Sequence, residues 1–527
     1  MRWLEIDLVD FTIVQEGFVR KSVGHRELYH SPGSEWVTDI SQIREAEYAQ
    51  LIVIDPIERT VAFGRDYLGH YPLTYAATRY RLYISDSYVY VHHAVRTAQG
   101  ALTLSQEALA LYFTMGYVPH GRSVYDEIVN CHATGYYLWK NGQVRRVNLF
   151  HPIEIHASES THQIGEAIEG EVARLSSNGK AIDIWCSGGL DSSIMAIRFN
   201  SAGRRADLLT LSYGNEIHES WGDGEGRFVR AIAKAANAPV REVELNSLKF
   251  MQMHTAFAAH HNGPVIDFPL PPKYALAEAT RDIAVTGEAG DTFFGGTKNS
   301  AMAYAIHKQP GAKLGKLFAL AHQRYFEQLG TIFKYGRELS CFAEEYCEKL
   351  TQAYPGDTSR KLFYLNAHEK LGGMIFHQSY FPSQIFGKQV RHPLASLAVY
   401  EAAFRVPDHR KFSYPFSKIA LMELYESQLP SVIVRRKKSG TQIPLDHYLD
   451  FLCREPIDFS ALAEAKVFRE DLLEKLCHQD VRSLISPQLL YAFITLNLWL
   501  KTKESPHVES LSPQSGHHKQ SRIIEHV

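Results

Sequence analysis

The stretch AIDIWCSGGLDSS, residues 181–193, decides the fold of this chain. Its apolar run ends at Cys186, a glycine turn follows at 187–189, and a helical pattern begins near Ser192. Glycines let a backbone approach a ligand closely, and a helix N-terminus offers free N–H donors with a positive dipole. Ser187 and Ser192 add hydroxyl groups. The order strand, glycine turn and helix therefore predicts a loop that cradles phosphate groups.

A second glycine-rich segment, GEAGDTFFGG (287–296), follows another apolar run, DIAVTG (282–287). An acidic residue beside a phosphate is explained if it holds Mg²⁺, and Asp291 is placed to share that ion with Asp191. Loops at the carboxyl edge of a parallel sheet are where such folds bind nucleotides. The alternative is that both segments are ordinary turns with N-capping acids. It is disfavoured because each segment follows an apolar strand.

From about residue 160, apolar runs alternate with amphipathic patterns, which predicts a parallel sheet with crossover helices. We expect strands at 181–186, 207–213, 240–245 and 282–287, and a helix at 226–237. Residues from about 300 to 500 read as predominantly helical. The tail at 504–527 is polar and contains Ser, Pro and Gly throughout, so disorder is predicted there.

The first 150 residues read as mostly β. Short runs rich in β-branched and aromatic residues predict strands near the N-terminus and at 51–56, 60–66, 73–77, 81–86, 135–140 and 143–150. Asn141-Gly142 predicts a hairpin between the last two, and Ser105 is expected to cap a helix at 105–117. Because 527 residues exceed one ordinary core, we expect separate domains at 1–155 and 160–503.

The composition and a few sequence patterns argue against several classes of function. The 56 basic and 58 acidic residues nearly balance, so the protein has no overall electrostatic potential that would attract nucleic acid or an anionic membrane. The N-terminus lacks a signal-peptide pattern, and no apolar run is long enough to span a membrane. The six cysteines form no CxxC pair, and the 26 histidines lack metal-site spacing. We therefore expect a cytoplasmic protein without a disulfide framework.

Several motifs carry a family resemblance. SGGLDSS resembles the pyrophosphate loop of the asparagine-synthetase-like ATP pyrophosphatases, and GEAGDTFFGG resembles their second loop, GEGSDEXFGG. GRDYLGHYPLTY (64–75) is similar to an N-terminal motif of the family, FGKQVRHPL (386–394) to its substrate-side segment GVEARVPFL, and 416–441 to its closing basic loop. The resemblance implies an α/β fold: an N-terminal-nucleophile-type (Ntn-type) mostly-β sandwich, then a doubly wound parallel-sheet ATP-pyrophosphatase domain with a helical C-terminal part.

The resemblance also implies site residues. For ATP they are Ser187, Gly188, Gly189, Asp191, Ser192 and Gly287, with the backbone at Leu211 and Ser212 against adenine. Asp191 and Asp291 would hold Mg²⁺. Lys418 and Lys438 would neutralise the phosphates, because fixed ammonium groups stabilise charge that develops in the reaction. Taken alone, RRKK (435–438) is better explained as a solvated basic run, and only its register against the family motif favours the phosphate role for Lys438.

The chain departs from the family in three places. Members that hydrolyse glutamine carry an N-terminal cysteine, whereas Arg2 and Trp3 stand there in this sequence and the nearest cysteine is Cys131. The first domain is therefore expected to be a degenerate glutamine-amidotransferase-like domain. Glu288 stands where β-lactam synthetases carry a tyrosine, and Gln389 replaces the acidic residue of GVEARVPFL.

Residues 377–449 look most like the cyclases of lasso peptides. That resemblance implies a macrolactam synthetase of antibiotic biosynthesis, which adenylates a carboxylate and joins a core peptide's N-terminal amine to an Asp or Glu side chain. Glu288 would either accept the amine proton or only orient the loop or the ion. The implied partners are the precursor peptide and a leader-removing protease. The alternatives are a β-lactam-synthetase-like or ammonia-dependent small-molecule amide ligase, and a non-enzymatic nucleotide-binding scaffold.

Overall fold

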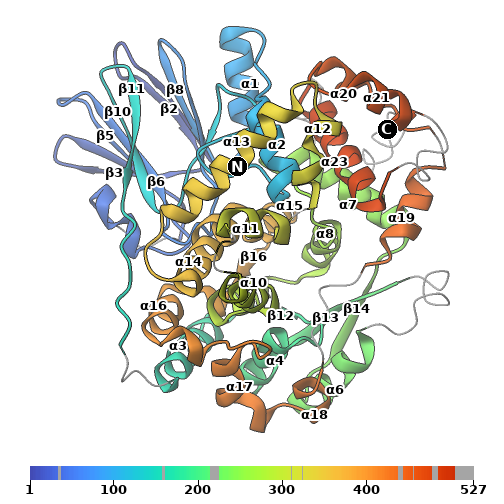
Figure 1. Ribbon diagram of the computed structural model, residues 1–527. Helices are drawn as coiled ribbons and strands as arrows, with labels where there is room; N and C mark the ends of the chain where they lie inside the picture. The colour runs from blue at the N-terminus through green and yellow to red at the C-terminus, as the bar shows by residue number, and fades with distance from the viewer. Residues whose placement is uncertain are drawn as a thin grey trace.

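The computed structural model describes residues 1–33, 37–156, 161–203, 205–213, 225–309, 311, 313–322, 324–436, 443–454, 456–477 and 485–504. Figure 1 shows a β-rich N-terminal part at the upper left and a parallel sheet surrounded by helices in the lower half. None of the helices formed by these residues combines the length and the apolar character that crossing a membrane requires.

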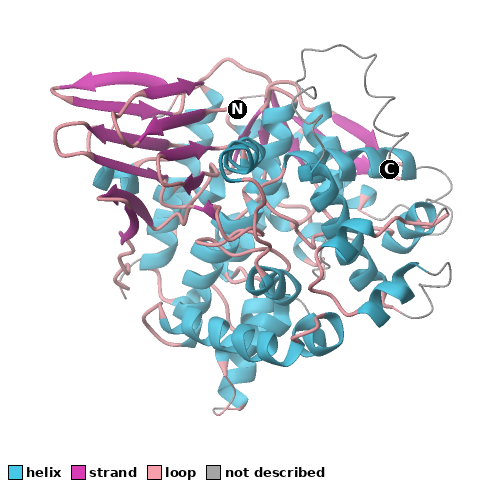
Figure 2. Cartoon of the chain, turned by 90° about the horizontal axis from the view of Figure 1, so that it is seen from above, coloured by secondary structure: helices cyan, strands magenta, loops and turns pink. Residues whose placement is uncertain are grey.

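Two antiparallel sheets build the N-terminal part. One has the order β2 (Ile13–Glu16), β1 (Trp3–Asp7), β8 (Arg81–Ser85), β7 (Thr74–Ala77), β9 (Val129–Asn130). The other has the order β11 (Gln143–Asn148), β10 (Gly135–Lys140), β6 (Thr60–Arg65), β5 (Gln50–Asp55), β4 (Arg26–His30), β3 (Val19–Val23). Apolar side chains of both sheets share one core, including Leu4, Ile84 and Phe63. This confirms the predicted sandwich, whose strands gather on one side of the molecule in Figure 2.

Local signals in the sandwich are also confirmed, with one difference. Asn141 and Gly142 both have positive φ (53° and 79°), as a two-residue hairpin between β10 and β11 requires. Helices α1 (Tyr88–Gln99) and α2 (Gln106–Met115) follow β8. Ser105 is the N-cap residue of α2, but its side chain makes no capping hydrogen bond. Burial of nearly every residue of α2 therefore stabilises this helix more than its cap does.

The parallel sheet has the order β14 (Val240–Glu244), β13 (Asp207–Ser212), β12 (Ile182–Trp185), β15 (Ile283–Val285), β16 (Gln389–Arg391). All neighbours pair in parallel, which confirms the four predicted strands and adds β16 from the FGKQVRHPL segment. The first strand, β12, lies in the middle, so the direction of winding reverses between β12 and β15. The loops after these two strands are therefore neighbours at the switch point of the sheet.

Helix α3 (His162–Ser176) precedes the first strand of the sheet, and the crossover helices are α4 (Leu190–Ser201), α6 (Gly226–Ala236), α7 (Ser247–His260) and α8 (Leu270–Ala279). The predicted helix at 226–237 is confirmed as α6. Helix α4 begins at Leu190, two residues before the expected start, because Gly189 is extended and acts as its N-cap. Asp191 consequently lies in the first turn of α4, where the helix dipole stabilises a negative charge.

The described residues between 300 and 500 are mainly helical, as predicted. The helices after β15 are α9 (Gly290–Phe294), α10 (Thr297–Lys308), α11 (Leu314–His322), η2 (Arg324–Gln328), α12 (Leu329–Ile332), α13 (Gly336–Gln352), α14 (Thr358–Tyr364), the π-helix η3 (Leu365–Ile375), α15 (His377–Ile385), η4 (Pro393–Ala395), α16 (Leu397–Arg405), η5 (Asp408–Arg410), α17 (Ile419–Tyr425), η6 (Glu426–Gln428), α18 (Ser431–Val434), α19 (Leu445–Leu452), α20 (Ser460–Glu464), α21 (Glu470–Cys477) and α23 (Pro487–Glu504). Apart from Glu504, the predicted disordered tail lies outside the described residues.

A buried arginine joins the sandwich to η3 and α15. The fully buried Arg65 donates to Nε2 of His377 (2.8 Å) and to the carbonyl oxygens of Gly372 and Tyr71 (3.2 Å each). At Gly372 a Cβ atom would overlap the carbonyl oxygen of Leu68, and at Gly69 (φ +81°) one would lie 3.1 Å from the Cα atom of Gly372. The backbones of the two parts therefore touch without intervening side chains.

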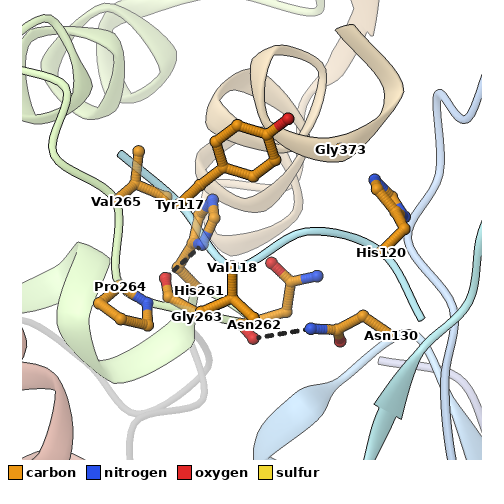
Figure 3. A pocket seen from close by; sticks show the side chains of 10 residues that line it. All are labelled: Tyr117, Val118, His120, Asn130, His261, Asn262, Gly263, Pro264, Val265 and Gly373. Atoms are coloured by element: carbon orange, nitrogen blue, oxygen red, sulfur yellow. Dashed lines mark hydrogen bonds between the residues drawn. The ribbon is translucent and has the colours of Figure 1, made fainter. Parts of the chain in front are cut away.

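A small hollow lies at the same junction, and Figure 3 shows its lining. Asn130 of β9 donates to the carbonyl oxygen of Asn262 (3.4 Å), and His261 Nδ1 bonds to the carbonyl of Gly263 (2.9 Å). The cavity volume is about 10 Å³, room for about one water molecule. This hollow is too small to receive a substrate.

Candidate nucleotide and acyl-transfer site

The two glycine loops meet at a single lysine. The ammonium group of Lys418 pairs with a carboxylate oxygen of Asp191, and it lies 2.9 Å from Oδ1 of Asp291. Asp191 lies in the first turn of α4, which follows β12, and Asp291 in the first turn of α9, which follows β15, so the two acids predicted to act together do lie together. The side chain of Lys418 is 6% exposed and that of Asp291 is 55% exposed. The cluster therefore has an open side at Asp291.

The charge on Lys418 is fixed by its surroundings. Burial alone would lower the pKa of Lys418, but the carboxylates of Asp191 and Asp291 outweigh it and raise the pKa above its ordinary value. Lys418 is also left-handed (φ 57°), and its N–H donates to the carbonyl of Phe294 at 3.1 Å. A non-glycine residue in this conformation persists only where its surroundings impose it. The site thus presents a permanent ammonium group in a defined place.

The loop at 187–192 has the geometry of a phosphate cradle. Gly188 has φ +65°, and a Cβ atom there would lie 2.5 Å from Cβ of Phe228. The hydroxyl of Ser192 donates to the carbonyl of Gly189 (3.2 Å), and the N–H of Gly189 donates to the hydroxyl of Ser187 (3.4 Å). These contacts hold the turn at the N-terminus of α4, where unpaired N–H groups can bind an anion.

The second loop packs against the first so closely that only glycine fits. A Cβ atom at Gly287 would lie 2.7 Å from the backbone nitrogen of Ser192, and one at Gly290 would overlap the carboxylate of Asp191. At Gly296 a Cβ atom would lie 2.5 Å from Oδ1 of Asp291. The glycines of GEAGDTFFGG are therefore required for contact between the loops as well as for the turn itself.

Leu211 and Ser212 end β13, next to the phosphate loop strand β12. Leu211 pairs with Val243 of β14, whereas β12 ends at Trp185 opposite Leu209. Both predicted adenine contacts are partly exposed. The carboxyl end of β13 therefore extends past β12 and leaves one backbone edge beside the phosphate loop.

Lys438, the second predicted phosphate lysine, lies outside the described residues. Arg436 precedes it and is anchored at the cradle. Its guanidinium donates to the carbonyl of Ser187 (3.0 Å), pairs with Glu225 (2.9 Å) and stacks on the ring of Phe228. A positive charge that the sequence did not single out thus lies directly against the phosphate loop.

Glu288, the candidate base, is engaged by a cation that sequence reasoning missed. Lys273 of α8 lies 2.9 Å from Glu288 Oε1 and 2.7 Å from the side-chain oxygen of Gln378. The amide of the fully buried Gln378 in turn donates to Asp267 at 2.6 Å. These four residues come from a loop, α8, the second glycine loop and α15. The sequence does not reveal that these residues lie together. The structure does, because it shows a buried amide that lies between charged groups.

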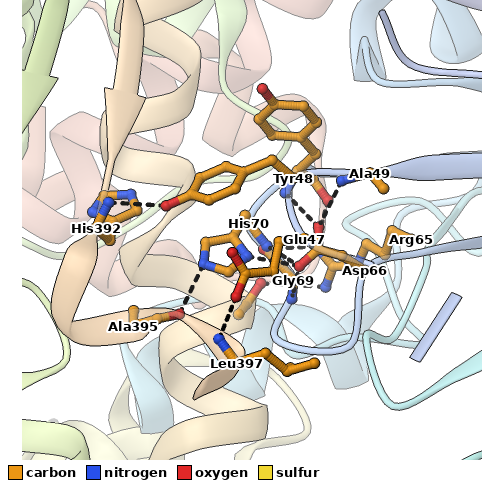
Figure 4. A network of polar contacts seen from close by, with 12 residues as sticks. Glu47, Tyr48, Ala49, Arg65, Asp66, Gly69, His70, His392, Ala395 and Leu397 are labelled. Atoms are coloured by element: carbon orange, nitrogen blue, oxygen red, sulfur yellow. Dashed lines mark hydrogen bonds and ion pairs between the residues drawn. The ribbon is translucent and has the colours of Figure 1, made fainter. Parts of the chain in front are cut away.

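The loop that carries Glu288 is supported from the sandwich, as Figure 4 shows in part. The hydroxyl of Tyr48 accepts the backbone N–H of His392 (2.9 Å), and His392 Nδ1 bonds to the hydroxyl of Thr286 (2.7 Å). Thr286 also accepts the N–H of Glu288 at 3.2 Å. In the same network His70 Nε2 bonds to the carbonyl of Ala395 (3.1 Å). The N-terminal part thus contributes to the rigidity of the second glycine loop.

The donor set fits a divalent cation only in part. Within the described ranges no group of three or more His, Cys, Asp and Glu side chains could hold a metal by itself. Two carboxylates, from Asp191 and Asp291, suit Mg²⁺, which commonly uses one or two protein carboxylates together with substrate phosphates. Lys418 neutralises the same two acids. The residues fit Mg²⁺ that arrives with a nucleotide better than Mg²⁺ bound alone.

The sandwich holds a single cysteine, and its chemistry is unfavourable. Cys131 is 1% exposed in the core, and burial raises the pKa of its thiol far above the ordinary value. A buried thiol of this kind is not a nucleophile. The side chain of Arg2 is also held by buried partners. Its guanidinium donates to Asp86 (2.8 Å) and to the hydroxyl of Tyr380 in α15 (2.6 Å).

Comparison with known proteins agrees with this geometry. The sequence model of the family described as Asparagine synthase matches residues 164–501, well over half of the 527 residues. The chain is also similar to Asparagine synthetase (glutamine-hydrolyzing) 1 of Bacillus subtilis (strain 168), with 20% identity over 440 residues. That similarity covers 74% of this chain and 66% of the relative, so the chain spans just under two thirds of the relative's length.

Proposed function

The chain belongs to the asparagine synthase family, and on this premise we propose that it is an ATP-dependent amide ligase that forms AMP and pyrophosphate. The observation that carries the proposal is the meeting of Asp191 and Asp291 at Lys418, where the winding of the parallel sheet reverses. Such a site combines a phosphate cradle, a fixed cation and two acids that suit Mg²⁺.

The proposed reaction has two steps. An oxygen of the substrate carboxylate attacks the α-phosphorus of ATP, which gives an acyl-adenylate and releases pyrophosphate. A substrate amine then attacks the acyl carbonyl carbon, the bond to the phosphate oxygen breaks, and AMP leaves. Bound with the nucleotide between Asp191 and Asp291, Mg²⁺ would neutralise phosphate charge. Lys418 and the N-terminus of α4 would stabilise the negative charge that develops on the departing pyrophosphate.

The roles of the remaining predicted residues follow from this scheme. Ser187, Gly188, Gly189 and Ser192 would line the triphosphate, and Gly287 would keep the second loop against the first. The backbone at Leu211 and Ser212 would face adenine, and Lys438 would be the second phosphate lysine. We assign residues 1–155 to a degenerate amidotransferase-like domain and residues 160–503 to the synthetase domain.

We further propose that the substrate is a ribosomally made peptide whose N-terminal amine is joined to an Asp or Glu side chain, as in lasso-peptide cyclases. Three features support this substrate: Glu288 in place of a tyrosine, Gln389 in place of an acid, and the absence of an accessible thiol at Cys131. If both reacting groups belong to one bound peptide, amide formation is intramolecular, an advantage of roughly 7–11 kcal/mol when the geometry is good. The precursor peptide and a leader-removing protease would be its partners in the cytoplasm.

The test measures pyrophosphate release with ATP and Mg²⁺, with and without synthetic peptides that carry a free amine and one Asp or Glu at successive positions. A cyclase gives peptide-stimulated release and a product lighter than the peptide by the mass of one water. Asp191→Asn should abolish the stimulation, whereas Asp126→Asn, an exposed acid of the sandwich, should not. Stimulation by free amino acids but by no peptide would contradict the cyclase and favour a small-molecule ligase. No release with any acid would refute the ligase.

A further inference from the structure

A hydrogen-bonded chain of side chains adjoins the second glycine loop. It runs from Asp267 through Gln378 and Lys273 to Glu288, with donor–acceptor distances of 2.6, 2.7 and 2.9 Å. Its last member is three residues before Asp291, whose carboxylate contacts Lys418. The chain therefore ends beside the proposed nucleotide site, and Asp267 is its other end. We call these four residues the acceptor cluster.

Within the acceptor cluster, Glu288 is poorly suited to remove a proton. Its carboxylate forms an ion pair with Lys273, whose side chain is 14% exposed. To accept a proton, Glu288 would have to give up this partner and leave a largely buried ammonium group without its counter-ion, which is costly. Its position is consistent with holding Lys273 and the loop, which is the other role that the sequence left open.

Asp267 has the opposite environment. Among the residues that the structure describes, its carboxylate forms no ion pair, and its hydrogen-bonding partner is the side-chain amide of Gln378. Asp267 is a partly buried residue and lies next to the fully buried Gln378. Gln378 is fully buried and bonds to both Asp267 and Lys273, which fixes the direction of the Asp267 carboxylate. An oriented carboxylate without a paired cation can bind an ammonium group.

We propose that Asp267 is the catalytic residue that binds the positively charged primary amine of the substrate and accepts its proton. This inference rests on the proposed function, since it concerns the second step at the same site. Gln378 is a positioning residue, because it acts through Asp267. Lys273 pairs with Glu288 at the edge of the glycine loop, and Glu288 takes no part in the proton transfer.

The proton balance of the step is as follows. The ammonium group R–NH₃⁺ donates one proton to the Asp267 carboxylate and becomes a neutral amine. The nitrogen lone pair then forms the bond to the carbonyl carbon of the acyl-adenylate. When the tetrahedral intermediate collapses, the carbon–oxygen bond to AMP breaks, AMP leaves with the electron pair, and the nitrogen loses its second proton to solvent. Asp267 finally returns its proton to solvent.

The charges around Asp267 agree with this role. The groups that face it are Lys273 of α8, Lys370 of η3, Glu288 of the second loop, the amide of Gln378 in α15 and Tyr491 of α23. Burial raises the pKa of Asp267, although Lys273 and the Gln378 amide oppose this. A carboxylate with a raised pKa is a stronger base. Because Asp267 must be deprotonated to act, the rate of amide formation should fall as pH drops through its pKa.

The experiment separates the two steps of the reaction. The probe is whichever peptide of the set described above gives the fastest exchange of labelled pyrophosphate into ATP with the wild type. Asp267→Asn should leave this exchange within about twofold, because exchange needs no amine, and should slow amide formation by roughly 100-fold or more. Glu278→Gln, an exposed acid of the same helix as Lys273, is the matched control and should change neither rate.

Two further readouts distinguish proton acceptance from a structural role. Hydroxylamine is already uncharged at neutral pH, so Asp267→Asn should form the hydroxamate at the wild-type rate. The acid limb of the pH–rate profile for amide formation should disappear in Asp267→Asn and return in Asp267→Glu. Thermal unfolding of each variant verifies that it is folded.

The outcomes bear on different proposals. If the wild-type protein shows no pyrophosphate exchange that depends on a carboxylic acid substrate, the proposed function is wrong. The role of Asp267 is then wrong as well. Exchange in the wild type together with unimpaired amide formation by Asp267→Asn overturns the role of Asp267 alone. A variant that loses exchange, amide and hydroxamate formation equally would also refute it, because the carboxylate would then be needed for the whole site and not for the amine.

Discussion

Lys418 and Asp291 form an ion pair of 2.9 Å in which the lysine side chain is 6% exposed. The two residues come from segments far apart in the chain, and Asp191 joins them from a third. Removing the buried ammonium group of Lys418 would leave the two carboxylates uncompensated. The resting site is therefore held together by the same groups that are proposed to act on the nucleotide.

Lys418→Met should make the stability of the protein depend on Mg²⁺. Without the ammonium group, Asp191 and Asp291 repel each other until another cation neutralises them. We expect Mg²⁺, without nucleotide, to raise the Tm of this variant by several degrees more than that of the wild type. Lys349→Met on the exposed face of α13 is the control. An equal effect of Mg²⁺ on all three proteins would contradict the prediction.

Gly290→Ala should damage stability and activity together. Its Cβ atom would overlap the Asp191 carboxylate, so the two loops must separate, at a cost of about 1–3 kcal/mol in the free energy of unfolding. The comparison is Gly170→Ala in the interior of α3, where nothing lies within 4 Å of the new Cβ atom. That change should stabilise the protein by roughly 0.5–1 kcal/mol. Urea unfolding measures stability, and pyrophosphate exchange measures activity. A change in stability of the same sign in both variants would refute the steric argument.

Arg65→Met should weaken the junction between the sandwich and the helical part. The variant leaves His377 and several carbonyl oxygens without their buried donor, which we expect to cost about 3–5 kcal/mol. Chemical denaturation measures this loss. Arg79→Met on the exposed surface should have no measurable effect. A loss below about 1 kcal/mol for Arg65→Met would mean that the buried hydrogen bonds are not what joins the two parts.

Glu369 should make the protein sensitive to acid. Burial alone would raise the pKa of Glu369, but His132 (3.0 Å) and the hydroxyl of Tyr354 (2.6 Å) outweigh it and lower the pKa from 4.5 to about 2. His132 Nδ1 accepts the N–H of Thr134, so the other ring nitrogen is the donor to Glu369. A lowered carboxyl pKa stabilises the folded state above the ordinary pKa, and this stabilisation is lost as pH falls toward 2.

Tm measured from pH 6 to pH 2 tests this assignment. Glu369→Gln should have a lower Tm at pH 6 and a shallower decline below pH 4.5 than the wild type. The exposed Glu464→Gln should follow the wild-type curve. Parallel curves for Glu369→Gln and the wild type would show that this carboxyl group does not titrate with unfolding.

Local patterns predicted the parts of the site that lie next to each other in the sequence. The strand–glycine–helix order around Gly188 and the acid in each glycine loop required no long-range information. The convergence of Asp191 and Asp291 also followed, because strand order in a doubly wound sheet brings the loops after β12 and β15 together. The hairpin at Asn141-Gly142 depended only on two residues with left-handed preference.

The acceptor cluster could not be predicted in this way. Lys273, Asp267 and Gln378 belong to segments whose packing is decided by tertiary contacts. Lys273 and Asp267 lie in no recognisable motif, and the resemblance over residues 377–449 did not single out Gln378. Gln378 in particular reads as one polar position in a helix, and only its complete burial between Lys273 and Asp267 reveals its role. The left-handed backbone of Lys418 is likewise imposed by its surroundings and not by its residue type.

The direct contact between Gly69 and Gly372 limits how this molecule can be recombined. A chimaera that grafts the sandwich of another family member onto this helical part would fit without adjustment only if the donor supplied a residue without a side chain opposite Gly372. A Cβ atom at position 69 would lie 3.1 Å from the Cα atom of Gly372, so η3, which carries Glu369 and Lys370, would have to shift by a few tenths of an ångström. The two halves are thus interchangeable only as a matched pair.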